Sequence, residues 1–80
     1  QERRETMDLI QSMLLAKETG GLIKRDQYTL LMKYEPTFKC YVWCWENGKI
    51  VADESDKYKV KRVILSHKLL HDDWYIVYIQ

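Results

Sequence analysis

Residues 38–52 read FKCYVWCWENGKIVA, and this stretch decides the fold. Near its centre stand Asn47 and Gly48, two residue types that tolerate the positive backbone φ angles of a type I′ hairpin turn. The residues on both sides of the turn are aromatic or β-branched, as β-strands prefer. The sequence therefore predicts a β-hairpin with a two-residue loop, in which Cys44 pairs with Val51.

Side chains alternate along this hairpin and into the residues that follow it, and this alternation predicts two faces. One face is expected to be the core, and it carries Phe38, Cys40, Val42, Cys44, Val51, Tyr58 and Val60. The other face holds aromatic rings edged by lysines, which are Tyr41, Trp43, Trp45, Lys57, Lys59 and Lys61. We expect this second face to be a binding surface, unless Trp43 and Trp45 are themselves buried, as tryptophan often is.

The rest of the chain predicts one helix and further strands. Residues 2–18 carry apolar side chains at helical spacing, and the two glycines at 20 and 21 end that pattern. The residues expected to face the core are Met7, Ile10, Met13 and Leu14, with Leu9 and Ala16 alongside. Strands are expected at about 27–34, 38–45, 49–54, 58–70 and 74–79. The stretch 22–35 is ambiguous, because it also fits a helix that would make residues 7–35 resemble a helix-turn-helix.

These elements predict the fold class α+β. An N-terminal helix is expected to pack on a four- or five-stranded antiparallel β meander, against the face of Cys40, Val42, Cys44, Val51 and Val60. The chain has 80 residues, which suits one small domain with one core.

Composition narrows the classes of protein to which this chain belongs. The formal net charge is +1, so the surface as a whole is not an electrostatic trap for nucleic acid. No apolar run approaches the ~18 residues of a membrane span, and no membrane partner is expected. Cys40 and Cys44 would lie ~13 Å apart on one strand, too far for a disulfide. Free thiols favour the cytoplasm or the nucleus.

The sequence does not predict catalysis, a metal or another cofactor. Cys40, Cys44, His67 and His71 are residue types that bind zinc, but two thiols ~13 Å apart cannot share one ion. Neither cysteine stands at a helix N-terminus or a strained elbow, where thiolates are activated. No glycine-rich phosphate loop is present.

The leading functional prediction is a small non-enzymatic intracellular module that binds another protein, as a regulator or inhibitor, through Tyr41, Trp43 and Trp45. The alternative is binding of a single-stranded nucleic acid on the same face, because bases stack on flat rings and lysines neutralise phosphates. The apolar last strand, at about 74–79, is also a candidate for homodimerisation if it lies at an edge of the sheet.

Overall fold

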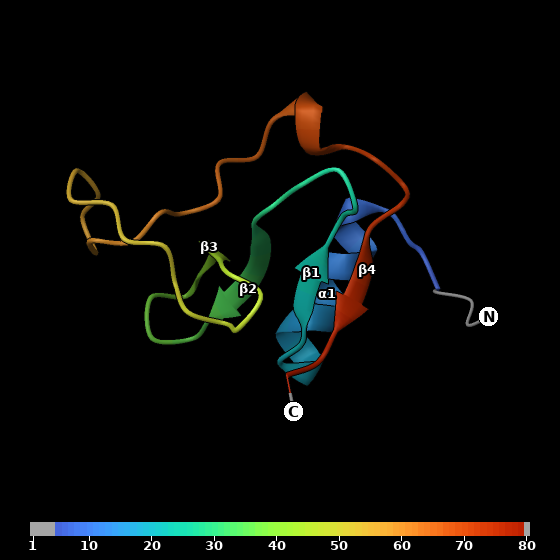
Figure 1. Ribbon diagram of the computed structural model, residues 1–80, viewed down its shortest axis with the longest axis horizontal. Coiled ribbons are helices and arrows are strands. Elements are labelled where there is room, and N and C mark those ends of the chain that lie inside the picture. Colours follow the sequence, from blue (N-terminus) through green and yellow to red (C-terminus); the bar gives the residue numbers. More distant parts are fainter. Residues whose placement is uncertain (1–4, 80) are drawn as a thin grey trace.

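The computed structural model describes residues 5–79 and contains one α-helix, four strands and one short 3₁₀ helix. These elements are α1 (Leu9–Thr19), β1 (Leu22–Lys24), β2 (Leu31–Glu35), β3 (Cys40–Cys44), η1 (His67–Leu69) and β4 (Tyr75–Val77). The strands form one antiparallel sheet in the order β3-β2-β1-β4, and α1 packs against one face of it (Figure 1). The predicted fold class, a helix on a small antiparallel sheet, is confirmed. Strands β1 to β3 form a meander, whereas β4 returns to pair beside β1.

Helix α1 is bounded by residues whose chemistry suits the two ends. Asp8 is the N-cap, because its carboxylate accepts the backbone N–H of Gln11 at 2.8 Å while the Gln11 side chain accepts the backbone N–H of Asp8 at 3.4 Å. Gly20 ends the helix in the left-handed region, at φ 80°. The predicted start of the helix is wrong, because Met7 forms an antiparallel bridge with Trp74 instead. The first three residues of that prediction lie outside the described residues.

The inward face of α1 also differs from the prediction. Its buried residues are Leu9, Ser12, Met13 and Ala16. Ile10 and Leu14, which were expected to face the core, are exposed to solvent. The hydroxyl of Ser12 donates to the carbonyl of Leu9 at 2.7 Å, so a polar side chain is accommodated on the buried face of the helix. The predicted stripe is therefore right for Leu9, Met13 and Ala16 and wrong for Ile10 and Leu14.

The helix packs on the sheet face that holds Trp43, not on the face of Cys40, Val42 and Cys44. The register sets Ile23 opposite Met32, and Met32 opposite Trp43, so these side chains share one face. The buried cluster on this face is Leu9, Met13, Ala16, Ile23, Met32, Leu69 and Trp74. A second, smaller cluster lies on the other face and contains Leu22, Leu31 and Cys44, with Val77 against it. The prediction was wrong because both faces of β3 are apolar, so alternation could not say which one faces the helix.

The hairpin after β3 is present, but its register differs by one residue. Cys44 pairs with Ile50 rather than with Val51. The N–H of Gly48 donates to the carbonyl of Trp45 at 2.8 Å, and the N–H of Trp45 donates to the carbonyl of Lys49 at 2.9 Å. Of the Asn-Gly pair only Gly48 has a positive φ, at 86°. The loop therefore has three residues and ends on a left-handed glycine. An Asn-Gly pair suits this three-residue loop as well as it suits the two-residue loop that was predicted.

The ambiguous stretch 22–35 contains two strands, β1 and β2, with a turn between them. The turn is closed by a hydrogen bond from the N–H of Tyr28 to the carbonyl of Arg25, at 2.9 Å. The expected strand at 27–34 is therefore wrong in its first half, and a helix-turn-helix is excluded. In contrast, β3 and β4 lie inside the expected ranges 38–45 and 74–79.

The expected strands at 49–54 and 58–70 are reduced to single bridges, which join Cys44 to Ile50, Ala52 to Val60 and Val42 to Arg62. Residues 52–60 leave the sheet as a projecting hairpin, seen at the left of Figure 1. Within it Lys59 has a φ of 62°, which interrupts any regular strand. Further along, Ser66 caps η1 by accepting the N–H of Lys68 at 3.3 Å, so the second half of 58–70 is not a strand.

Candidate binding groove

The three aromatic residues predicted for the site occupy different environments. The ring of Tyr41 packs against the core, and its hydroxyl donates to the carbonyl of Met13 in α1 at 2.6 Å. Burial raises the pKa of this hydroxyl above its ordinary value. Trp43 also packs against the core but keeps part of its surface in solvent. Trp45, one residue beyond β3, is 46% exposed.

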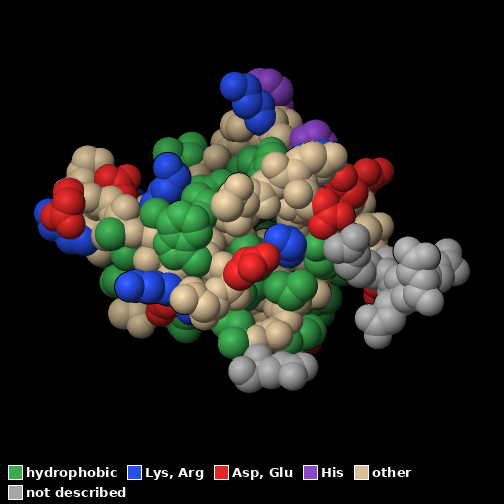
Figure 2. Space-filling view, in the orientation of Figure 1, with side chains coloured by type: hydrophobic (Ala, Val, Ile, Leu, Met, Phe, Trp, Pro, Cys, Tyr) green, Lys and Arg blue, Asp and Glu red, His purple; other side chains and the backbone are tan. Residues whose placement is uncertain are grey.

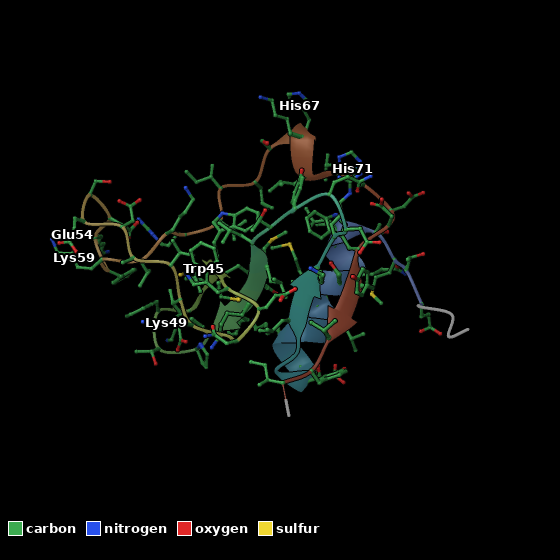
Figure 3. The ribbon with its side chains drawn as sticks, in the orientation of Figure 1. Trp45, Lys49, Glu54, Lys59, His67 and His71 are labelled. Carbon is green, nitrogen blue, oxygen red and sulfur yellow. The ribbon has the colours of Figure 1, made fainter. Side chains whose placement is uncertain are left out.

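The exposed ring of Trp45 belongs to an apolar region of the surface. Figure 2 shows hydrophobic side chains over the β2–β3 half of one face, with lysine or arginine side chains beside them. In the same orientation, Figure 3 shows Trp45 and Lys49 close together on the turn that follows β3. Beside Trp45 is an open hollow that Lys24, Thr29, Glu46 and Asn47 complete.

Two of the three predicted lysines lie away from the aromatic rings. Lys57 and Lys59 stand on the projecting hairpin, whose tip lies far from Trp45 (Figure 3). The ammonium of Lys57 lies over the ring of Tyr58, 5.1 Å from its centroid, and that of Lys59 donates to the carbonyl of Glu54 at 3.3 Å. Both cations are thus engaged within the hairpin itself.

Lys61 and Trp43, in contrast, are held together by the fold. The N–H of Trp43 donates to the carbonyl of Lys61 at 2.9 Å. Both residues line a shallow groove of about 360 Å³. The other lining residues come from the turn between β1 and β2, and they are Gln27, Tyr28, Thr29 and Leu30. We call this the Tyr28–Trp43 groove.

Tyr28 is the residue of this groove that the sequence did not single out. Its ring centroid lies 6.4 Å from that of Trp43 and 5.4 Å from that of the buried Trp74. Its hydroxyl donates to the carbonyl of Lys68 at 3.1 Å, and the guanidinium of Arg25 lies 5.3 Å from its ring centroid. A signal was available, because the polar residues at 26 and 27 separate two apolar runs and mark a turn.

The groove is apolar on its floor and carries one cation. Among its described lining residues only Lys61 is charged, and its side chain is exposed. The nearby guanidinium of Arg25 is already paired, with its Nε 2.6 Å from Oδ1 of Asp73, and this bond lowers the pKa of the Asp73 carboxyl. An occupant of the groove would therefore meet two aromatic rings and one exposed positive charge.

The two thiols are not arranged for chemistry. Cys40 and Cys44 are both free, and Cys44 is fully buried. Burial raises the pKa of the Cys44 thiol to about 11, and desolvation also raises that of Cys40. Both groups are thus protonated and poorly nucleophilic at neutral pH. Within residues 5–79, no three side chains of histidine, cysteine, aspartate or glutamate come close enough to hold a metal ion.

Comparison with known proteins gives no relative: no protein-family model, no curated protein and no solved structure matches this chain. In the part of the chain that the structure describes, no helix has the length and apolar character needed to cross a lipid bilayer.

Proposed function

We propose that this protein is a non-enzymatic module that binds another protein, in the manner of a regulator or inhibitor, at the Tyr28–Trp43 groove. The observation that carries the proposal is the pair of tilted aromatic rings, 6.4 Å apart, that opens to solvent in a groove of about 360 Å³. Tyrosine and tryptophan in a well-packed depression are the residues that dominate the energy of protein interfaces.

Rigidity supports this proposal. Tyr28 is contacted by Trp43, Trp74 and Arg25 and is tied by its hydroxyl. Both backbone groups of Trp43 are bonded, because its N–H donates to the carbonyl of Lys61 and its carbonyl accepts the N–H of Val51 at 3.0 Å. Side chains that are already fixed lose little conformational entropy when a partner binds, so more of the contact energy appears as affinity.

The chemistry of the groove indicates what a partner offers. The floor suits one large apolar side chain, since Tyr28, Leu30 and Trp43 are among the residues that line it. Lys61 at the margin favours a carboxylate next to that side chain. We therefore expect a segment in which an aromatic or aliphatic residue stands beside aspartate or glutamate.

Single-stranded nucleic acid is the less well supported partner. Binding of a phosphate backbone needs several cations that track the strand alongside the stacking rings. Lys57 and Lys59 are engaged in the projecting hairpin, so of the three predicted lysines only Lys61 stands beside the rings. We also propose an intracellular location, in cytoplasm or nucleus, which the free thiols Cys40 and Cys44 support.

A display experiment tests the proposed function. Random peptides are selected against the 80-residue chain, and the selected peptides are titrated with each variant by tryptophan fluorescence. We expect aromatic or aliphatic residues flanked by acidic ones to be enriched. Lys61→Glu should weaken their binding about tenfold or more, because one attractive charge contact becomes repulsive. The matched control Lys57→Glu makes the same charge change on the projecting hairpin and should leave binding intact.

Other outcomes would contradict this assignment. Peptides that bind Lys61→Glu as tightly as the native chain would exclude the groove as their site. Salt-sensitive quenching by a single-stranded oligonucleotide, weakened equally by Lys57→Glu and Lys61→Glu, would favour the nucleic-acid alternative instead.

A further inference from the structure

Strand β4 forms one edge of the sheet, and its outer side is bonded at one point in the described part of the chain. There Trp74 and Met7 exchange two backbone hydrogen bonds, of 2.8 and 3.1 Å. Before this contact, residues 5 and 6 diverge from β4 (Figure 1). Among the described residues, the strand thus continues past its one outer neighbour.

The direction of the remaining backbone groups follows from this contact. Backbone N–H and C=O groups point alternately to the two sides of a strand. Since Trp74 directs its groups outward to Met7, Tyr75 and Val77 direct theirs inward to β1, and Ile76 directs its groups outward. The same alternation, carried one residue past the end of β4, turns the groups of Tyr78 outward as well. Among the described residues, no hydrogen bond reaches the outward groups of Ile76 and Tyr78.

The edge strand lacks the charged side chains that usually keep other strands from pairing with an open edge. Residues 74–79 read WYIVYI and include no charge, in a chain of which 31% is charged. Tyr78 and Ile79 are each 57% exposed. Proteins normally guard a bare edge with lysine, proline or a bulge, because unpaired strands recruit other strands. An uncharged edge with two vacant pairing positions is suited to a partner strand.

We propose that the occupant of this edge is a second copy of the same chain, paired antiparallel through β4. In this arrangement Ile76 of each copy lies opposite Tyr78 of the other, and a two-fold axis passes beside Val77. Each of the two Ile76–Tyr78 pairs exchanges N–H···O=C bonds in both directions. The two four-stranded sheets become one continuous sheet.

The register is selected by the existing contact at the end of the strand. A pairing centred on Ile76 would set Trp74 opposite Tyr78 and displace Met7 from its bridge. A pairing centred on Val77 sets Ile76 opposite Tyr78 and reaches Tyr75 with Ile79, one residue short of the bridge at Trp74. Keeping that bridge requires the partner strand to leave the edge after Ile79.

The side chains also favour a copy of this chain over a charged partner. Across the axis Val77 meets Val77, next to the buried cluster of Leu22, Leu31 and Cys44. On the helix face Ile76 meets the exposed ring of Tyr78, an aromatic pair with a β-branched residue of the kind that stabilises sheets. No like charges are brought together, since the strand has none. Such an isologous contact is the commonest form of homodimer.

Sedimentation of the full chain over a wide range of concentrations tests this proposal. We expect a reversible monomer–dimer equilibrium, because a contact between two short strands buries little area. Tyr78→Lys places a charge on the edge and should leave the protein monomeric at every concentration, with the circular dichroism spectrum of the native fold. The matched control Ile64→Lys makes the same kind of change at a residue that is 82% exposed and outside the sheet, and it should dimerise as the native chain does.

Amide hydrogen exchange adds a measurement of the register. At concentrations where the native chain is dimeric, the amides of Ile76 and Tyr78 should become protected, and in Tyr78→Lys the amide of Ile76 should stay unprotected. A native chain that sediments as a monomer throughout would overturn the proposal. A dimer that persists in Tyr78→Lys, or whose formation leaves these two amides unprotected, would equally overturn it.

Discussion

The two edges of the sheet are treated in opposite ways. The outer edge of β3 is covered by the chain itself, because Trp43 donates its N–H to the carbonyl of Lys61 and accepts from the N–H of Val51. Two separate segments, around residues 50 and 62, thus share this edge, and the projecting hairpin is the loop between them. The outer edge of β4 has the bridge to Met7 as its one described contact.

Because only one of the two edges is covered, the two sides of the sheet suit different kinds of contact. Covering β3 removes its edge as a pairing site but brings Lys61 beside Trp43, so the covered side offers a groove lined by side chains. The outer edge of β4, in contrast, offers backbone N–H and C=O groups to which another strand can pair. A protein partner at the groove would contact side chains near β3, whereas a second copy would pair with the backbone of β4. These strands lie at opposite edges of the sheet, so one molecule has room for both.

The largest expected effect is Trp74→Ala, which tests whether the β4 side depends on this one residue. Trp74 is fully buried, and its indole N–H donates to the carbonyl of Leu69 at 3.0 Å. Its truncation should cost about 3–5 kcal/mol, comparable with the whole stability of a small domain. Trp45→Ala, at the covered edge, should cost less than about 1 kcal/mol because its ring is half in solvent.

Urea unfolding followed by circular dichroism measures both variants. If Trp74→Ala is marginally stable or unfolded while Trp45→Ala is nearly as stable as the native chain, the β4 side depends on its tryptophan and the turn after β3 does not. Equal losses would break the contrast between the two edges, because they would mean that the turn after β3 is as deeply integrated in the core as β4.

The contrast between the edges also marks the limit of what sequence reasoning could predict. The strand pattern of β3, the apolar pattern of β4 and the glycine stop of α1 are local signals, and the fold class followed from them. Trp43 and Lys61 were both named for the site from the sequence, and they do meet at the groove.

The predictions that were wrong concern contacts between residues far apart in the sequence, or a turn that fits two loop lengths. Both faces of β3 are apolar, so the choice of face for α1 rested on packing against Ile23 and Met32. The turn at Gly48 fits a two-residue and a three-residue loop, and this one-residue difference moved Cys44 opposite Ile50. The sequence does not predict Tyr28 as a site residue, because the two rings that it contacts, those of Trp43 and Trp74, are remote from it in the sequence.

A smaller effect is expected from Gly48→Ala, which tests a link between the two edges. Gly48 belongs to the turn after β3, and a Cβ there would overlap the Cδ1 atom of Ile79, beyond β4. The matched control is Gly20→Ala, because Gly20 has a similar φ of 80° but nothing within 4 Å of an added Cβ. Both variants should lose roughly 1–2 kcal/mol to the left-handed backbone.

Gly48→Ala should lose about 0.5–1 kcal/mol more than Gly20→Ala, since the flexible Ile79 side chain must move aside. A double-mutant cycle with Ile79→Ala isolates this difference by urea unfolding. If Gly48→Ala and Gly20→Ala are equally destabilised, or if Ile79→Ala does not remove the excess, the contact between the two edges makes no contribution to stability.

The smallest effect concerns two arginine–aspartate pairs, one near each edge. Near β4, Nε of Arg25 lies 2.6 Å from Asp73, and in the projecting hairpin beside β3, Nε of Arg62 lies 2.7 Å from Asp56. The bond from Arg25 lowers the pKa of Asp73. The backbone N–H of Tyr58 lowers the pKa of Asp56, and the bond from Arg62 lowers it further.

A carboxyl whose folded pKa is lowered stabilises the fold above its unfolded pKa, near 3.8, and this stability is lost as pH falls through the folded value. The urea midpoint should therefore decline below about pH 4, and Asp73→Asn should flatten that decline. Asp56→Asn should flatten it more, because the titrating Asp56 side chain is 11% exposed against 45% for Asp73 and also accepts the backbone N–H of Tyr58 at 2.8 Å. A larger flattening in Asp73→Asn would contradict this order and would show that the approach to β4, rather than the covering segment of β3, is the electrostatically anchored side of the sheet.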